Sequence, residues 1–117
     1  MAYVDGFVVP VPKDRIEEYK QLASLAAGIW KEYGARDYVE CLADDAPHGE
    51  LTSFPRAVQL KDEEVVAFSW IVYDSREQRD AINAKVMADP RFKPFEGKYP
   101  FDTKRMIWGG FQPFVGM

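Results

Sequence analysis

Apolar side chains recur along this chain in two different rhythms. Residues 3–11 and 65–73 are nearly continuous runs of β-branched and aromatic residues, of strand length rather than helix length. Between Pro12 and Gly34, apolar residues instead recur at intervals of three and four. This spacing predicts a long amphipathic helix that begins at the proline and ends at the glycine.

Three shorter segments complete the pattern. Residues 36–45 contain β-forming side chains followed by two aspartates, which predicts a second strand that runs into a loop. Ser75 and Gln78 have the spacing of a capping box, so a second helix is predicted to follow and to end before Pro90. Residues 105–115 predict a last strand.

Two further local features lie within this pattern. Gly109 and Gly110 interrupt the last strand and indicate either a bulge or a close approach of another group to the backbone. The segment 46–64 has no clean period, although Ser53 before Pro55 predicts one short helical turn. The sequence assigns no role to this segment.

The predicted order of elements is βαββαβ, within a single domain that covers residues 1–117. This order is typical of the α+β, ferredoxin-like fold, in which two helices cover one face of a four-stranded antiparallel sheet. A wet second face would require alternating polar residues, yet residues 3–11 and 65–73 are apolar on both sides. We therefore expect a second copy of the chain to cover the helix-free face, giving a homodimer.

Each predicted strand carries one compact and one bulky set of side chains. Small residues such as Gly6, Ala43 and Ala67 allow helices to approach closely, so we expect the bulky sets to lie on the helix-free face. Cys41 falls in the compact set and is expected to be a small buried side chain. The helix-free face would then gather Tyr3, Asp5, Tyr38, Glu40, Phe68, Trp70 and, with them, Trp108.

The two carboxylates among these aromatic rings are the candidate catalytic groups. An ionised carboxylate in an apolar site must be paired, hydrated or protonated with a raised pKa. Asp5 and Glu40 are therefore candidate catalytic acids or bases, with Arg105 as their counter-charge and the aromatic residues as ligand-binding groups. Arg36 and Arg56 are further cations near strand ends. The alternative is that both acids form structural ion pairs or lie wetted at an edge.

Composition narrows the function. The apolar fraction of 47% suffices for a real core, and a net charge of −4 with a pI near 5.0 argues against a surface that tracks phosphates. One cysteine and one histidine allow neither an internal disulfide nor a multi-histidine metal cage. The sequence contains no signal-peptide pattern and no membrane-spanning run, which predicts a soluble, cytoplasmic protein. We expect neither a cofactor nor a metal.

One loop is a candidate metal site. The stretch DDAPHGE brings Asp44, Asp45, His48 and Glu50 within seven positions, and these residue types bind divalent ions. No defined metal-binding spacing is present, and ordinary turn chemistry explains the same residues.

Several long phrases together resemble a known family. YVDGFVVPVP, GARDYVEC, TSFPRAV, FSWIVYDS, RDAINAKVMADPRF and PFDTKRMIWGGF are similar to the YbaA-like family of bacterial proteins of unknown function. The resemblance covers almost the whole chain and implies the dimeric α+β barrel superfamily. That superfamily includes cofactor-independent monooxygenases, haem-degrading enzymes, muconolactone isomerases and stress-related dimers. Fold alone selects none of these activities.

The sequence leaves three functional hypotheses. In the first, a homodimer holds a small apolar or aromatic molecule and acts as a cofactor-independent enzyme of the oxygenase or isomerase type. In the second, the chain is a non-enzymatic structural or stress-related dimer whose acids are structural. The third, an RNA-linked accessory, receives no support from the acidic charge.

Overall fold

The structure of the protein is a computed structural model that describes residues 2–116. Its strands and helices follow the order predicted from the sequence. The elements are β1 (Tyr3–Pro12), η1 (Lys13–Arg15), α1 (Ile16–Glu32), β2 (Asp37–Leu42), α2 (Phe54–Ala57), β3 (Glu64–Tyr73), α3 (Arg76–Met87), η2 (Pro90–Phe95) and β4 (Ile107–Phe111).

The four strands form one antiparallel sheet in the order β2-β3-β1-β4. With α1 and α3 as the two crossover helices, this is the ferredoxin-like βαββαβ arrangement. The prediction of an α+β fold with a four-stranded antiparallel sheet is confirmed.

Local sequence signals explain where the helices begin and end. Gly34 has a φ of +115°, and Ala35 N–H donates to the Trp30 carbonyl at 3.0 Å, so α1 ends in a Schellman motif. The start of α1 differs from the prediction. Pro12 stays extended and pairs with Glu64 in the sheet, so one 3₁₀ turn precedes the α-helix.

Serine caps begin the other two α-helices. The hydroxyl of Ser75 accepts a hydrogen bond from the backbone N–H of Gln78 at 3.1 Å, as the capping-box spacing predicted. Ser53 caps α2 in the same way through the N–H of Arg56, which confirms the short helical turn in the segment without a clean period.

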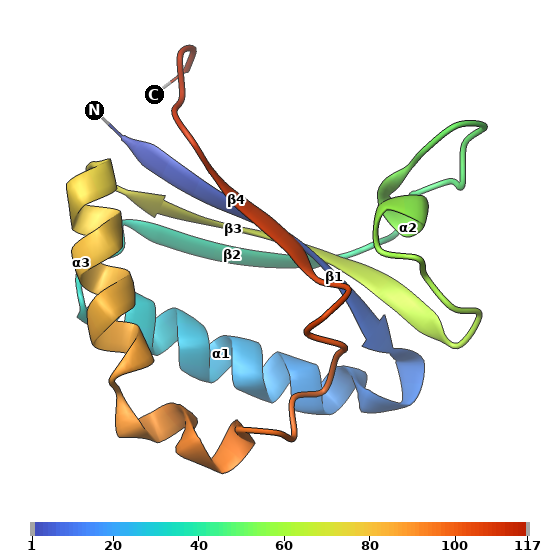
Figure 1. The fold of residues 1–117 in the computed structure, drawn as a ribbon, viewed down its shortest axis with the longest axis horizontal. Coiled ribbons are helices and arrows are strands. Elements are labelled where there is room, and N and C mark those ends of the chain that lie inside the picture. Colours follow the sequence, from blue (N-terminus) through green and yellow to red (C-terminus); the bar gives the residue numbers. More distant parts are fainter. Residues whose placement is uncertain (1, 117) are drawn as a thin grey trace.

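Figure 1 shows α1 and α3 on one side of the sheet, together with the chain between α3 and β4. We call this connection, residues 89–106, the strap. The main core lies between the sheet and the two long helices, where Ile29, Ile71, Tyr73 and Ile82 pack together. A smaller cluster around Val58 lies on the opposite face, under the short helix α2. Neither α1 nor α3 covers this face, and we call it the helix-free face.

The glycine pair in β4 accommodates a close approach rather than a bulge. β1 and β4 pair in continuous register from Val8 opposite Ile107 to Val4 opposite Phe111. A Cβ atom on Gly110 would collide with the Tyr3 ring and the Arg79 guanidinium. Of the two predicted alternatives, the close approach is therefore the one observed.

Replacing Ile82 by alanine tests the main core. Ile82 is 1% exposed between α3 and the sheet, so Ile82→Ala should lower the free energy of unfolding by about 2–5 kcal/mol in urea denaturation. Lys85→Ala, at an exposed position of the same helix, should change it by no more than about 0.5 kcal/mol. Equal effects of the two substitutions would contradict this packing.

Candidate functional site

Side chains from all four strands meet on the helix side of the sheet. Residues directly opposite each other on neighbouring strands share a face, and Ile71 packs against α1 and α3, which identifies that face. Two neighbouring rows of side chains cross this face from β4 to β2. The first row consists of Trp108, Phe7, Ser69 and Glu40, and the second consists of Gly110, Asp5, Ile71 and Tyr38.

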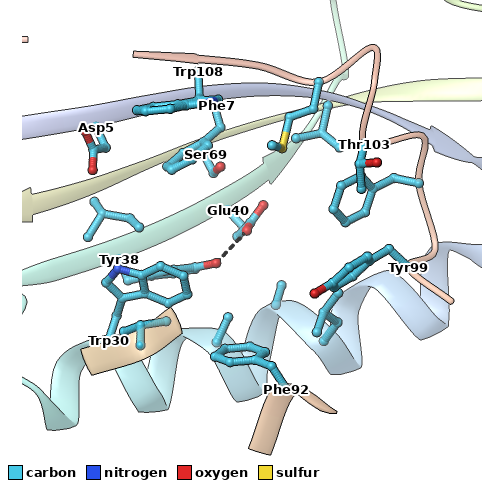
Figure 2. Close-up of a pocket in the computed structure, with 18 of the residues that line it drawn as sticks. Asp5, Phe7, Trp30, Tyr38, Glu40, Ser69, Phe92, Tyr99, Thr103 and Trp108 are labelled. Carbon is cyan, nitrogen blue, oxygen red and sulfur yellow. Dashed lines mark hydrogen bonds between the residues drawn. The ribbon is translucent and has the colours of Figure 1, made fainter. Parts of the chain in front are cut away.

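These rows form the floor of a cavity of about 520 Å³. Its roof comes from α1, α3 and the strap, which contribute Tyr19, Leu22, Ala23, Ala26, Trp30, Asn83, Val86, Met87, Asp89, Phe92, Glu96, Tyr99, Phe101, Thr103 and Met106. Figure 2 shows Glu40 in the middle of this space, with Trp30, Phe92 and Tyr99 across from Phe7 and Trp108. The volume is within the range of small-molecule sites.

Two arginines, Arg15 and Arg91, hold the strap over the cavity. Arg15 donates to the Tyr99 carbonyl at 3.3 Å. Arg91 forms an ion pair of 2.8 Å with Glu32 at the end of α1. Arg91 and the Tyr33 hydroxyl also donate to Asp89, and these hydrogen bonds hold the pKa of Asp89 well below its usual range. The roof is thus tied to the first helix at both ends.

Glu40 is the central polar group of the cavity. Its Oε1 accepts a hydrogen bond from Tyr19 Oη at 2.7 Å, and its Oε2 accepts one from Tyr38 Oη at 2.9 Å. Within residues 2–116, no lysine, arginine or histidine forms an ion pair with this carboxylate. The charge is therefore stabilised by two hydroxyl dipoles rather than by a cation.

This environment changes the ionisation of all three groups. Burial raises the pKa of Glu40, although the two tyrosine hydrogen bonds act in the opposite direction. Burial, and then the neighbouring carboxylate, also raise the pKa values of Tyr19 and Tyr38. Both phenols consequently remain donors, and the glutamate is the group that exchanges its proton most readily.

Asp5 lies at one end of the cavity wall and is 1% exposed. Its Oδ1 is 3.7 Å from Arg79 Nε, and neither atom has a hydrogen-bond partner in the described part of the chain. Burial raises the pKa of Asp5 more than the Arg79 charge lowers it. The guanidinium itself stacks 4.9 Å from the Tyr3 ring centroid and donates to Tyr3 Oη at 3.0 Å.

Asn83 links this end of the cavity to its aromatic wall. Its Oδ1 accepts hydrogen bonds from Trp30 Nε1 at 3.1 Å and from Tyr73 Oη at 3.3 Å. The Trp30 ring then lies 5.8 Å from the Tyr38 ring and 6.0 Å from the Phe92 ring. The asparagine of α3 thereby orients an indole that belongs to α1.

The predicted assignment of faces was correct for β3 and wrong for β1, β2 and β4. Phe68 and Trp70 do lie on the helix-free face. Asp5 pairs with Ile71 rather than with Trp70, so it points to the helices. The same register places Tyr3, Tyr38, Glu40 and Trp108 on the helix side. Cys41 pairs with Phe68 and is exposed on the opposite face, not buried under helices.

The criterion failed for a physical reason. The helices enclose a cavity instead of packing directly on the sheet, so the side beneath them accommodates large rings such as Phe7 and Tyr38. The compact residues Gly6 and Gly109 instead make room for the Phe111 ring on the other face. Compactness alone therefore does not identify the face that helices cover.

The cations also differ from those predicted. Arg105 is not the counter-charge of the cavity acids. It pairs with Glu64 at 2.6 Å and with Asp102 at 2.9 Å, outside the cavity lining. Arg36 pairs with Asp74 at the surface, and Arg56 donates to carbonyls of the 48–49 loop.

Four residues of the site were not predicted from the sequence: Tyr19, Trp30, Arg79 and Asn83. A usable signal was present for Arg79. In the predicted topology β1 and β3 are antiparallel, so the helix that follows Tyr73 begins beside Tyr3 and Asp5. An arginine one turn into that helix could have been placed near the aspartate.

Metal binding finds no geometric support in the described residues. Among residues 2–116, no three His, Cys, Asp or Glu side chains lie close enough together to hold a metal ion. The residues Asp44, Asp45, His48 and Glu50 of the predicted loop therefore form no such group. In the same residues, no helix has both the length and the apolar character required to cross a bilayer.

The sheet order and the helix-side cavity define an α+β protein of ferredoxin-like topology with an internal aromatic pocket. The chain belongs to the family described as "Protein of unknown function (DUF1428)", whose model matches residues 2–103. It is 52% identical over 115 residues to the uncharacterized protein YbaA of Escherichia coli strain K12 and to that of Shigella flexneri, covering 98% of both chains. The resemblance to the YbaA-like family is confirmed.

Two solved structures share the fold at low sequence identity. Rv0793 from Mycobacterium tuberculosis aligns with a TM-score of 0.57 at 13% identity, covering 99% of this chain and 98% of that one. The de novo designed protein Foldit4 aligns with a TM-score of 0.52 at 7% identity, covering 97% of this chain and 100% of that one. These likenesses show the fold alone.

The raised pKa of Glu40 predicts an unusual pH dependence of stability. As the pH rises above 4.5, the ordinary glutamate value, the unfolded chain loses the proton before the folded protein does. Folding is therefore penalised progressively until the pH passes the folded-state pKa. Glu40→Gln removes this penalty, so the stability of the variant relative to the parent should increase from pH 4 to pH 7 in urea denaturation.

Glu64→Gln is the matched control because the pKa of Glu64 is shifted in the opposite direction to that of Glu40. Arg105 hydrogen-bonds Glu64 and lowers its pKa, so the pair stabilises the fold above the unfolded pKa and loses that contribution as the pH falls. The stability of Glu64→Gln relative to the parent should therefore decrease from pH 4 to pH 7. Parallel profiles for the two variants would contradict the assignment.

Proposed function

We propose that the chain binds a small, largely apolar molecule in the helix-side cavity and that Glu40 exchanges a proton with it. The observation that carries this proposal is a carboxylate in a cavity of about 520 Å³, held by two phenols and paired with no cation among the described residues. A carboxylate kept only as a structural element would be expected to bind a cation or face water.

The chemistry available to such a site is general acid–base catalysis without a cofactor. Glu40 accepts a proton from the bound molecule and returns it at another atom, which is an isomerisation. Its raised pKa brings the carboxyl group closer to neutral pH, where a proton acceptor works efficiently. Tyr19 and Tyr38 position the carboxylate and donate hydrogen bonds to it while it is ionised.

Asp5 has a supporting part in this proposal. Its carboxylate faces Arg79, so it is not the free base of the cavity. It lines the end of the cavity together with Asn83, which orients Trp30. Arg105 takes no part, since it holds the strap to β3.

The proposed protein acts as a homodimer that buries the helix-free face of the sheet. Side chains on this face are almost entirely uncharged, and several large ones are exposed, including Phe68 at 40%, Ile107 at 44% and Phe111 at 63%. Contiguous apolar patches on soluble proteins mark interfaces, and a two-fold dimer covers such a patch with its own copy. An uncharged surface suits this arrangement because it brings no like charges together.

Tryptophan fluorescence tests the binding proposal. Trp30 and Trp108 line the cavity, whereas Trp70 lies on the other face of the sheet. Compounds from a broad library of small aromatic molecules, with neutral, acidic and basic members, should change the emission of the parent protein and of Trp70→Phe. The change should be smaller in Trp30→Phe and mostly lost when Trp30 and Trp108 are both replaced by phenylalanine. A library without any response would contradict the proposal.

A charge on the helix-free face tests the dimer. Phe111→Glu should convert the protein to a monomer in size-exclusion chromatography with light scattering, because an unpaired carboxylate would be buried at the interface. Gln21→Glu adds the same charge at an exposed position of α1, on the helix side, and should leave a dimer. A monomeric parent protein at micromolar concentration would overturn this part of the proposal.

A further inference from the structure

The charges that line the cavity all have the same sign. Four carboxylates contribute to its wall, those of Asp5, Glu40, Asp89 and Glu96, while the described lining contains no lysine, arginine or histidine. An anionic ligand would have to approach these groups without a compensating cation. The lining therefore selects against carboxylates, phosphates and sulfates.

Two of the four carboxylates have a nearby guanidinium. Asp89 accepts two hydrogen bonds from Arg91, and Asp5 faces Arg79 at 3.7 Å. Compensation of Asp5 is incomplete, since its buried Oδ1 has no hydrogen-bond partner within residues 2–116. Glu40 forms no ion pair with any residue in that range, so the centre of the cavity carries negative potential.

Aromatic rings surround this centre. Trp30, Tyr38 and Phe92 form one contiguous group, with centroids 5.8 and 6.0 Å apart. A second group on the opposite side joins Tyr99 to Phe101 at 5.6 Å and Phe101 to Tyr19 at 5.8 Å. Ring faces carry negative potential and attract cations, most strongly where water is excluded.

The same acids do not suit an inorganic cation. A divalent metal needs several oxygen ligands around one point, and no three such side chains converge among the described residues. Asp5 and Glu40 are two strands and two residues apart, which separates their Cα atoms by about 12 Å. The cavity wall between them is mostly apolar. Such a wall suits an organic cation, whose hydrocarbon part can pack against it.

We propose that the ligand of this cavity is a small organic cation, an amine or quaternary ammonium compound, whose charged group lies near Glu40 and whose apolar part packs on the aromatic wall. This inference rests on the binding part of the proposed function and names the chemical class that the site accepts. It adds a positive charge to the small apolar or aromatic molecule expected from the sequence.

A pair of molecules with the same shape tests the inference in the unmodified protein. Trimethylphenylammonium and tert-butylbenzene differ by one charge and almost nothing else. The ammonium compound should bind at least about tenfold more tightly in fluorescence titrations, since a desolvated cation gains both from the rings and from the carboxylate.

The outcomes separate the two proposals. If tert-butylbenzene binds as tightly as the ammonium compound, the cation inference is overturned and the binding function remains. If neither compound binds at millimolar concentration, the cation inference is overturned, and the compound library described above decides the proposed function.

A substitution identifies the group responsible. Glu40→Gln should lower the affinity ratio of the two compounds by at least about threefold, with the share of the rings remaining. The affinity for tert-butylbenzene should stay within about twofold, which also reports that the cavity is intact. Glu96→Gln, which removes an exposed carboxylate from the strap, should preserve at least half of the ratio. A ratio unchanged by Glu40→Gln would overturn the assignment.

Discussion

Burial of the Glu40 carboxylate is the constraint on which the rest of the site depends. A charge removed from water costs free energy, and two phenolic hydroxyls offset part of that cost. Tyr38 belongs to the same strand as the glutamate, but Tyr19 comes from α1. The helix is therefore tied to the edge of the sheet at a fixed distance, and removal of either phenol would leave the charge less satisfied.

A cavity follows from that spacing because the residues between helix and sheet are too small to fill it. Ala23 and Ala26 on α1 and Ser69 on β3 are the small side chains of its lining. The strap closes the remaining side through ion pairs of Arg91 and Arg105. The described lining of the pocket thus comes from one chain.

The elements of this fold could be read from the sequence, because they depend on local signals. Gly34 ends α1 and Ser75 begins α3 as their residue types predict. The pairing register between strands, and with it the face on which each side chain lies, could not be predicted in the same way. Whether Asp5 lies opposite Ile71 or opposite Trp70 depends on a one-residue shift, which reverses the face of every side chain in the strand.

The candidate site was predicted in part for the same reason. Asp5, Tyr38, Glu40 and Trp108 share one cavity, as the sequence suggested, yet on the opposite face. Tyr3, Phe68 and Trp70, which were predicted to bind the ligand with them, are not part of its lining. The partners of the acids come from helices whose rotation about their own axes is set by packing. An amphipathic pattern shows that Tyr19 points inward, but not that its hydroxyl meets a carboxylate.

The most direct test of this account is a carbon-13 NMR titration of the Glu40 side-chain carboxyl group in the folded protein, assigned with the Glu40→Gln variant. The account predicts a midpoint above the ordinary glutamate value of 4.5, because burial raises the pKa against the two phenol hydrogen bonds. A midpoint at or below 4.5 would mean that the carboxylate is hydrated or paired with a cation, and it would contradict the central claim.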